Sequence, residues 1–474
     1  MNNKITSGTN RRSFLKSTAF GTLGITAIST GLISSCKTKP TDENTFGTVS
    51  QAINSGASSV VTRKNIASFA VNDPELQLLK DAVAILRKRS EKWPLDPTGW
   101  SENGALHTKF CATTEFTYQV HYSWYVWPWH RTYLWTLEKK LQHAVGEPKL
   151  ALHYWDWTKH PSIPEQYQGG KENPLYNDTR LVEPNDIIPF DFMNMGPALR
   201  AKKFMTFGGY PFPYKGQGPQ IDGIAEQSFH NNIHNWIGGE MAGFVAAGYD
   251  PIFYGHHGNC DRFWQAWLDA DQSHRNPLEA SWLEKVFYFT DEKGKPIGIK
   301  IKDVLDTKKL GYQFEDLDFN SEDGVYNSLE DKVVPSYDLV KASGIYNTSL
   351  EEERKVQSVE KIDLANASHV LLKYERTQLP YMPYCSRVFF LFGDAQPSPE
   401  NCKYIGTFTI LPIVSAEGGK LEKDVYMHVE ITRSIRDRIG AGEKIRVFFE
   451  PVQVRGRNIP DEPLEVKNIT YSFV

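Results

Sequence analysis

Cysteine, excess charge of one sign and long hydrophobic runs are all scarce in this 474-residue sequence. Five cysteines are too few for the disulfide scaffolds that stabilise small secreted domains. A formal net charge of −4 leaves no basic surplus, so we expect no nucleic-acid partner. Beyond the N-terminal segment, no stretch has the roughly 20 strongly apolar residues that a membrane-spanning helix needs.

The rest of the composition is typical of a globular protein, with 40% hydrophobic and 23% charged residues. The length predicts about three folded units at the usual ~150 residues each. Aromatic side chains are abundant at 13% of the chain, and there are 13 histidines. Because a count assigns no role to a histidine, the positions of these residues have to be considered.

The N-terminal residues 1–36 have the pattern of an export signal. Arg11 and Arg12 precede an uncharged, mildly apolar stretch, which predicts export by the twin-arginine route to the periplasm or the cell surface. The sequence Ile-Ser-Ser-Cys that ends at Cys36 is similar to a lipoprotein processing box and predicts an acylated Cys36 as a membrane anchor. The alternative is an ordinary cleavage site near Cys36. Residues 37–70 are rich in Ser, Thr, Asn and Gly and predict a flexible tether.

Helical periodicity recurs four times between residues 71 and 276. The segments with apolar side chains at helical spacing are residues 74–92, 129–145, 227–237 and 250–271. Asp73 is placed as a helix cap, and Gly146 as a helix end. Residues 71–276 therefore predict a mainly α domain built on a four-helix bundle, with long irregular connections between the helices.

Strand-like patterns replace helical ones after residue 276. Residues 277–319 contain two short strands around a turn, and residues 320–358 are acidic and polar, which indicates a linker. Alternating apolar runs recur through residues 359–474 and predict a β-sandwich or barrel. The expected fold class is therefore α+β with several domains.

Seven histidines form two groups along the chain. The groups are His107, His121 and His130, and then His230, His234 and the adjacent pair His256 and His257. His230 and His234 are four apart in a helical segment, so both imidazoles project from one face. His121 and His130 would lie on opposite faces of one helix, but a helix that starts at Pro128 lets His121 approach from the preceding segment.

Six imidazoles without a thiolate or carboxylate ligand suit copper better than zinc or iron. Only one of His256 and His257 should bind, because adjacent helical residues point about 100° apart. The H-x-x-x-H pair lacks the glutamate of a zinc protease, since Asn231 stands in its place. Packing of histidines in an aromatic core is the alternative explanation, and spacing alone leaves it open.

Two longer motifs resemble the type-3 copper family of tyrosinases, catechol oxidases and haemocyanins. The first runs from His121 to Arg131 and continues to Leu134 and Glu138, with Val126 and Trp127 where phenylalanines are usual in the family. The second is Asp-Pro-Ile-Phe-Tyr-Gly-His-His-Gly-Asn-Cys-Asp, residues 250–261. The resemblance implies a dinuclear copper site whose ligands are His107, His121, His130, His230, His234 and His257. It also places Asp261 one turn after His257.

The chain resembles plant-type polyphenol oxidases in particular, and we expect a bacterial, exported form of them. His107-Thr-Lys-Phe-Cys111 is similar to the family segment whose cysteine forms a thioether with the second ligand, which implies a bond between Cys111 and His121. The plant cysteine directly after the first ligand is absent, because Thr108 stands there. A plain buried Cys111 remains the alternative.

Three further residues match positions with roles in that family. Phe244 lies 13 residues before His257, where the family has a gate residue over the copper. Glu226 matches the acid that holds a water near the site, and Asn231 matches the residue associated with deprotonating monophenols through that water. Glu226 is alternatively a solvated acid at a helix N-terminus.

The second half also resembles plant oxidases. Residues 281–312 are similar to the small "DWL" segment, and residues 359–364 to the "KFDV" start of the C-terminal domain. The resemblance implies that this domain shields the site in a latent form. Cys385 and Cys402 are candidates for a disulfide in an exported protein, and their spacing leaves the pairing open.

The resemblance implies an enzyme that uses two copper ions and O2 to oxidise o-diphenols to o-quinones. Because Glu226 and Asn231 are both present, ortho-hydroxylation of monophenols is also expected. Small phenols and dioxygen are the expected partners. The alternatives are a catechol or aminophenol oxidase without monophenolase activity, a haemocyanin-like dioxygen carrier, and a zinc hydrolase.

Overall fold

The computed structural model describes residues 47–48, 60–112, 119–212, 220–319, 344–350, 364–378, 383–394, 396–398, 401–411, 422–452 and 466–474. The chain divides into a unit at Met1–Gly47 and a second unit at Thr48–Val474, to which nearly all described residues belong. The predicted export signal, Cys36 and most of the predicted tether lie outside the described residues.

Five helices make up most of the first half of the second unit. They are α3 (Pro74–Lys92), α4 (Trp100–Cys111), α5 (Val126–Val145), α8 (Asn231–Ile237) and α9 (Ile252–Ala270). The predicted cap of α3 is confirmed, since the Asp73 side chain accepts a hydrogen bond from the backbone N–H of Glu75. Helix α4 was not predicted, because it begins after Gly99 without a side-chain cap and has no regular apolar stripe.

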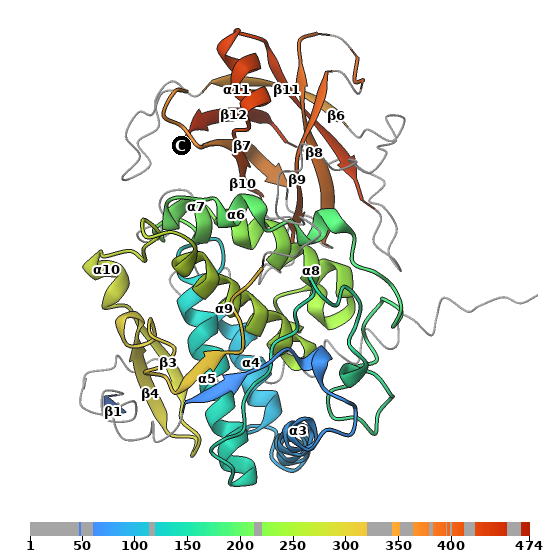
Figure 1. Cartoon of the computed structure of the whole chain (residues 1–474), viewed down its shortest axis with the longest axis vertical. Helices are drawn as coiled ribbons and strands as arrows, with labels where there is room; N and C mark the ends of the chain where they lie inside the picture. Colours follow the sequence, from blue (N-terminus) through green and yellow to red (C-terminus); the bar gives the residue numbers. More distant parts are fainter. Residues whose placement is uncertain are drawn as a thin grey trace, which may run out of the picture. The chain divides into compact units, whose positions relative to one another are not determined.

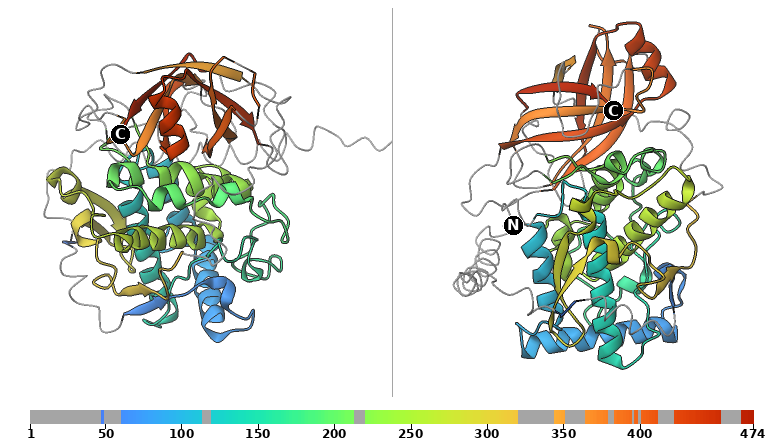
Figure 2. Two further views of the ribbon diagram at one scale, coloured as in Figure 1. Left: turned by 45° about the horizontal axis from the view of Figure 1, so that its top comes forward. Right: turned by 90° about the vertical axis from the view of Figure 1, so that its left-hand side faces the viewer.

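Helices α5 and α9 lie side by side in the middle of this helical domain (Figures 1 and 2). Helix α5 starts at Val126, three residues earlier than predicted, and ends at the left-handed Gly146 with φ 68°. A π-helical turn, Glu226–His230, leads directly into the short α8. The helical domain is thus confirmed, while its arrangement as a four-helix bundle remains a prediction.

Aromatic side chains fill the core around these helices. Six tryptophans are fully buried there, namely Trp129, Trp155, Trp157, Trp264, Trp267 and Trp282. Several of their indole nitrogens donate to backbone carbonyls, for example Trp282 to Trp124 at 3.0 Å and Trp267 to Ala201 at 2.8 Å. The large aromatic content therefore serves packing as well as any binding role.

Short strands brace the helical domain from both ends of its sequence. The antiparallel hairpin β3 (Val286–Thr290) and β4 (Pro296–Lys300) forms as predicted, and β3 packs against α5. The parallel pair β2 (Val61–Arg63) and β5 (Tyr312–Phe314) joins residues 251 positions apart. This pair brings the start and the end of the helical domain together.

The C-terminal residues form one seven-stranded sheet in the order β10-β7-β12-β6-β11-β8-β9. The strands are β6 (Gly344–Leu350), β7 (His369–Gln378), β8 (Tyr384–Phe392), β9 (Cys402–Ile410), β10 (Glu422–Glu430), β11 (Ile445–Pro451) and β12 (Asn468–Phe473). Helix α11 (Arg433–Gly440) packs on the sheet through Ile435 (Figure 2).

Of the two forms predicted for residues 359–474, a sandwich or a barrel, the closed barrel is not found among the described residues. Among the described residues the outer strands β9 and β10 are not paired with each other, so the sheet does not close into a barrel. Strand β6 is the middle strand and belongs to the segment expected as a linker, residues 320–358. Regular alternation does not distinguish one continuous sheet from two packed sheets, because both bury one face of each strand.

The disulfide between Cys385 and Cys402 is not formed. Both are buried free thiols on neighbouring strands, but the register places Cys385 opposite Thr409 and Cys402 opposite Leu391. The two positions are thus separated by roughly 20 Å along the strands, far beyond the span of a disulfide.

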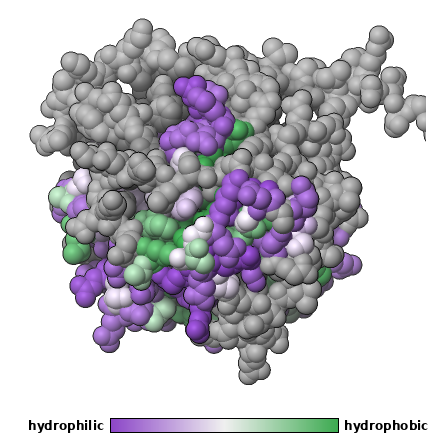
Figure 3. Space-filling view, turned by 90° about the horizontal axis from the view of Figure 1, so that it is seen from above, coloured by the Kyte–Doolittle hydropathy of each residue, from purple (hydrophilic) through white to green (hydrophobic). Residues whose placement is uncertain are grey.

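Large hydrophobic side chains are exposed at only a few places in the described part of the chain, with Leu278 the most open at 78%. On the face shown in Figure 3, a band of hydrophobic residues lies between hydrophilic ones. None of the described helices combines the length and the apolarity needed to cross a membrane.

Candidate metal centre

The first three histidines converge from three different segments. His107 lies on α4 and His130 on α5, while His121 lies in the connection between the two helices. Each Nδ1 is held by an acceptor: the Phe244 carbonyl for His107 (2.9 Å), Glu226 Oε1 for His121 (2.7 Å) and the Val126 carbonyl for His130 (2.7 Å). All three Nε2 atoms are buried and have no hydrogen-bond partner. This is how metal-binding imidazoles are oriented, with one nitrogen anchored and the other available.

The second group repeats this arrangement. His230 Nδ1 bonds to Asn231 Oδ1 at 2.9 Å, and His234 Nδ1 bonds to the Met241 carbonyl at 2.8 Å. His230 Nε2 is buried without a partner, and the Nε2 atoms of His234 and His257 face each other at 3.0 Å. Two imidazole nitrogens this close, with both rings buried, are well placed to share a cation.

The two groups are in direct contact. The rings of His130 and His257 stack with centroids 4.2 Å apart, and those of His121 and His230 lie 5.5 Å apart. His130, His230 and His257 line a common cavity with an empty volume of about 230 Å³. The donor atoms of His107, Cys111, His121 and His130 lie within 4.8 Å of one another, as do those of His230, His234, His256 and His257. The structure thus brings all six predicted ligands together.

His256 is also part of the second donor group. Its Nε2 lies 3.9 Å from Cys260 Sγ, and it does not line the cavity between the groups as His257 does. This geometry favours the predicted choice of His257, which remains a prediction.

Burial keeps these imidazoles neutral. It lowers the pKa of His121 and of His234 to about 3, and it holds the pKa of His107, His130, His230 and His257 well below the usual value. A neutral imidazole is the form that binds a metal, so at neutral pH no proton has to be displaced.

Glu226 and Asn231 both contact histidines of the centre. Glu226 is fully buried, and both of its oxygens accept from the Tyr122 backbone N–H at 3.2 Å besides the His121 contact. Burial raises the pKa of Glu226 to about 8. Asn231 accepts from His230, and its amide donates to the Thr409 carbonyl at 3.4 Å. Glu226 is therefore not the solvated helix acid that was the alternative.

Phe244 and Cys111 both lie beside the first group. The Phe244 ring is 3% exposed, and its centroid lies 4.4 Å from that of His121. Cys111 is a fully buried free thiol. Gln119 links it to the centre, since its amide donates to the Cys111 carbonyl at 2.8 Å and its oxygen accepts from the His121 N–H at 3.0 Å. Nothing in the sequence pattern indicated this role of Gln119.

A buried ionic network ties α5 to α9 behind the histidines. Asp261 accepts from Arg131 Nε at 2.6 Å and from the Tyr312 hydroxyl at 2.6 Å. Arg63 bonds Glu138 at 3.0 Å and lies over the Tyr312 ring at 3.5 Å. Asp261 thus lies one turn after His257 on α9, as expected. Its bond with Arg131 fixes α9 relative to α5, which carries His130. Arg63 and Tyr312 were not predicted, because their partners are distant in sequence.

Comparison with known proteins identifies the family. Residues 97–209 and 212–270 match the model of the common central domain of tyrosinase, and residues 278–321 match the polyphenol oxidase middle domain. The chain thus contains the central domain of the tyrosinase family, followed by the middle domain of polyphenol oxidases. Its relatives are named polyphenol oxidase and catechol oxidase, and the chain is accordingly an enzyme of the polyphenol oxidase type.

Two plant proteins and one solved structure illustrate the similarity. The chain is 26% identical over 461 residues to polyphenol oxidase E, chloroplastic, of Solanum lycopersicum, covering 86% of this chain and 77% of the relative. It is 27% identical over 409 residues to (+)-larreatricin hydroxylase, chloroplastic, of Larrea tridentata, covering 75% and 69%. The structure of latent apple tyrosinase shares the fold, with a TM-score of 0.67 at 20% identity over 88% of this chain and 98% of that one.

The family assignment is thereby confirmed, whereas the bacterial origin and the export are not supported by these relatives. Both plant relatives are described as chloroplastic.

Proposed function

We propose that the protein is a dinuclear copper phenol oxidase that uses O2 to oxidise o-diphenols to o-quinones. The observation that supports this most strongly is the convergence of six buried imidazoles, five of them with Nδ1 anchored by a named acceptor. The enzyme class shared with polyphenol oxidases gives the reaction type.

The residues fit two copper ions. His107, His121 and His130 would hold one, and His230, His234 and His257 the other. Four of these histidines have a buried Nε2 without a partner, and all six are neutral at physiological pH. When bound, the copper pair supplies the activation of dioxygen and the exchange of electrons with the phenol.

The chain's own groups orient the ligands and exclude water. Glu226 holds the proton on His121 Nδ1, and the carbonyls of Phe244, Val126 and Met241 hold those on His107, His130 and His234. The Phe244 ring against His121 supplies an apolar surface for a phenol ring.

A copper measurement on two neighbouring variants tests the ligand assignment. We expect His257→Ala to bind one copper ion per chain fewer than the wild type, because His257 faces His234 and lines the shared cavity. His256→Ala is the matched control and should keep both. Loss of copper from the His256 variant alone would overturn the choice between the two residues.

We further propose that monophenols are hydroxylated, with Glu226 and Asn231 receiving the phenol proton through a water. A relative with the name larreatricin hydroxylase supports this, while a catechol oxidase without monophenolase activity is the alternative. Asn231→Gly should lower the ratio of monophenol to diphenol turnover, measured on tyramine and dopamine. An unchanged ratio at normal copper content would contradict the role of Asn231.

A thioether between Cys111 and His121 is also proposed. Forming it removes the thiol hydrogen and one ring hydrogen, and the two electrons pass to dioxygen. The Cys111 sulfur lies within 4.8 Å of the ligand nitrogens of its group, which supports the proposal. Peptide mass spectrometry of the copper-loaded protein should show a crosslinked pair lighter by two hydrogens, absent in Cys111→Ala. Separate, unmodified peptides would contradict the crosslink.

We propose that the C-terminal sheet shields the site. Strand β9 contacts the helix that carries His234: the Asn232 amide donates to the Thr407 carbonyl at 3.0 Å, and the Thr409 hydroxyl donates to Asn232 at 2.9 Å. Arg387 on β8 pairs with the buried Asp191 of the helical domain at 2.8 Å. These contacts cover the side of the site formed by α8.

Weakening this contact should raise turnover. Arg387→Ala removes the ion pair with Asp191, so we expect faster oxidation of 4-tert-butylcatechol with little change in copper content. Arg438→Ala is the control, because Arg438 pairs with Glu443 inside the C-terminal domain at 3.0 Å. Equal rates in both variants and the wild type would contradict the shielding.

Export by the twin-arginine route and anchoring through acylated Cys36 are proposed from the sequence alone. Metabolic labelling with a radioactive fatty acid should mark the wild type and not Cys36→Ser. Absence of label in the wild type would contradict the anchor.

A further inference from the structure

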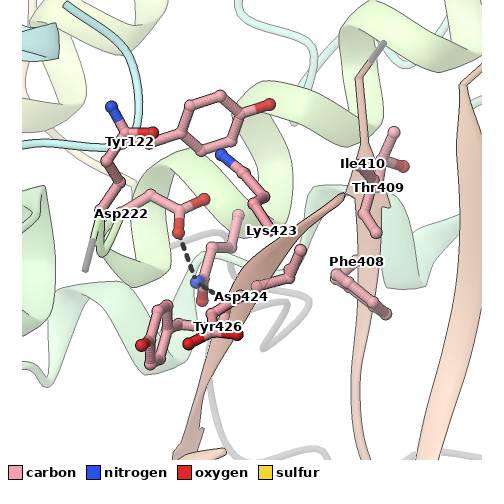
Figure 4. Close-up of a pocket in the computed structure, with 11 residues that line it drawn as sticks. Tyr122, Asp222, Phe408, Thr409, Ile410, Lys423, Asp424 and Tyr426 are labelled. Carbon is pink, nitrogen blue, oxygen red and sulfur yellow. Dashed lines mark hydrogen bonds between the residues drawn. The ribbon is translucent and has the colours of Figure 1, made fainter. Parts of the chain in front are cut away.

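A pocket with charged residues in its lining lies where β10 and β9 meet the helical domain. It has an empty volume of about 350 Å³ and is lined by residues that include Tyr122, Asp222, Gln227, Thr409, Lys423 and Tyr426 (Figure 4). The helical domain supplies an aromatic ring and a carboxylate, and the C-terminal domain supplies a lysine.

Lys423 extends from β10 into this pocket. Its Nζ lies 3.6 Å from the centroid of the Tyr122 ring, is buried and has no hydrogen-bond partner. In Figure 4 the ammonium end points towards the space between Tyr122 and Asp222. The ring face is therefore the nearest feature that stabilises its charge, as in other cation–π contacts.

A buried carboxyl group in its lining, Asp222, makes the pocket suitable for a cation. Asp222 and Glu226 both act electrostatically on Lys423. Asp222 is held in place by Gln227, whose amide donates to Asp222 at 2.9 Å and also to the Tyr426 carbonyl. Burial raises the pKa of Asp222 to about 8, and the ammonium of Lys423 opposes this shift. A cation in the pocket thus favours the ionised form of Asp222.

Tyr122 links the pocket to the residues of the metal centre. Tyr122 follows His121, and its N–H donates to Glu226, which also accepts from His121. The Tyr122 ring lies 6.0 Å from that of Phe244, which contacts His121. Tyr122 has a positive φ of 57°, a strained conformation for a bulky residue that holds the ring in this position.

We infer that this pocket is an ammonium subsite of the active site, and that Lys423 occupies it while the C-terminal domain is in place. The Tyr122 ring and the carboxylate of Asp222 would bind the protonated amine of a phenol whose ring lies against Phe244. The substrate class is then phenols that carry a protonated alkylamine on a short chain. This assignment rests on the proposed phenol oxidation, whereas the cation site itself does not.

The cation site is tested on the full chain without copper or substrate. Lys423→Ala vacates the subsite, so butylammonium chloride should raise its Tm, and the neutral isostere n-butanol should not. Lys423→Met fills the space with an apolar chain and should show no shift. Adding Asp222→Asn to Lys423→Ala should abolish the effect. Lys444→Ala, which removes a lysine paired with Asp394 on the surface, is the control.

Equal shifts with butylammonium and butanol, or none with either, would overturn the subsite. If Lys423→Ala does not fold in buffer, its recovery on refolding is measured instead. Rescue by butylammonium and not by butanol supports the subsite, and rescue by neither overturns it.

The substrate class is tested with two catechols that differ in the terminal amine, dopamine and 4-ethylcatechol. In Lys423→Ala the ratio of kcat/KM for dopamine to kcat/KM for 4-ethylcatechol should rise about thirtyfold over the wild type, the size of a desolvated cation–π contact. Adding Asp222→Asn should reverse the rise. Oxidation of both catechols with an unchanged ratio would overturn the substrate assignment and leave the phenol oxidase intact. If neither catechol is oxidised, the proposed function itself is wrong.

Discussion

At the scale of single residues, the histidines were predictable and their partners were not. The spacing of His230 and His234, the two longer motifs and the segment from His107 to Cys111 indicated all six ligands, and the structure brings these residues together. The acceptors that orient them are largely backbone carbonyls, such as those of Phe244 and Met241, which no residue pattern records. Lys423 and Asp222 also escaped prediction, because their meeting depends on how β10 contacts the helical domain.

Close packing around His107 provides a test at this scale. A Cβ on Gly248 would lie 2.8 Å from the Cβ of His107, so Gly248→Ala should displace that histidine. We expect loss of copper from the first group and a destabilisation of about 1–3 kcal/mol. Gly243→Ala is the matched control in the same loop, since nothing lies within 4 Å of its added Cβ. Normal copper content in the Gly248 variant would show that His107 is not rigidly held.

At the scale of elements, regular periodicity predicted α3, α9 and the β3–β4 hairpin well. Helix α4 and the π-helical turn before α8 were missed, because neither follows a regular apolar repeat. The sequence also did not predict the ionic network that links β2 and β5 to α5 and α9. This network joins Arg63, Asp261 and Tyr312, which are far apart in the sequence. Such long-range ion pairs leave no local pattern in a sequence.

This linkage predicts a specific effect of removing one hydroxyl. Tyr312→Phe keeps the ring under Arg63 but deletes the 2.6 Å hydrogen bond to the buried Asp261. The free energy of unfolding should fall by about 1–3 kcal/mol, measured by denaturant titration. Gln313→Ala, exposed on the same strand, is the control and should change little. An unchanged free energy of unfolding in Tyr312→Phe would show that hydrogen bonds from Arg63 and Arg131 alone satisfy Asp261.

At the scale of the whole molecule, the sequence indicated the helical domain and a β domain after it but not how the strands assemble. The order of the sheet and its contact with α8 depend on tertiary packing, in which buried polar groups take part. His428 on β10 is one of these groups. It is 5% exposed, and its ring stacks on Tyr210 of the helical domain. Its backbone N–H donates to the side-chain oxygen of Gln227.

His428 predicts acid sensitivity of this contact. Burial lowers its pKa to about 3, so the folded protein holds it neutral while the unfolded chain takes up a proton below about pH 6.5. Its contribution to stability is therefore complete above pH 6.5 and is lost as the pH falls towards 3. Between pH 8 and pH 5 the wild type should lose about 2 kcal/mol more than His428→Gln, followed as Tm against pH.

The comparison with His428→Gln isolates this residue from its titratable neighbours. His369 is also buried with a lowered pKa and acts in the same direction, whereas the raised pKa of Asp222 acts in the opposite one. Parallel Tm profiles for the two proteins would show that His428 is not held neutral.

The most direct test of a dinuclear copper phenol oxidase is o-quinone formation from 4-tert-butylcatechol in air, followed as copper is titrated into metal-free protein. Six neutral imidazoles in two adjoining groups predict that quinone appears only as the second copper ion binds, and that zinc gives none. Absence of quinone with two copper ions bound, or equal activity with zinc, would contradict the assignment.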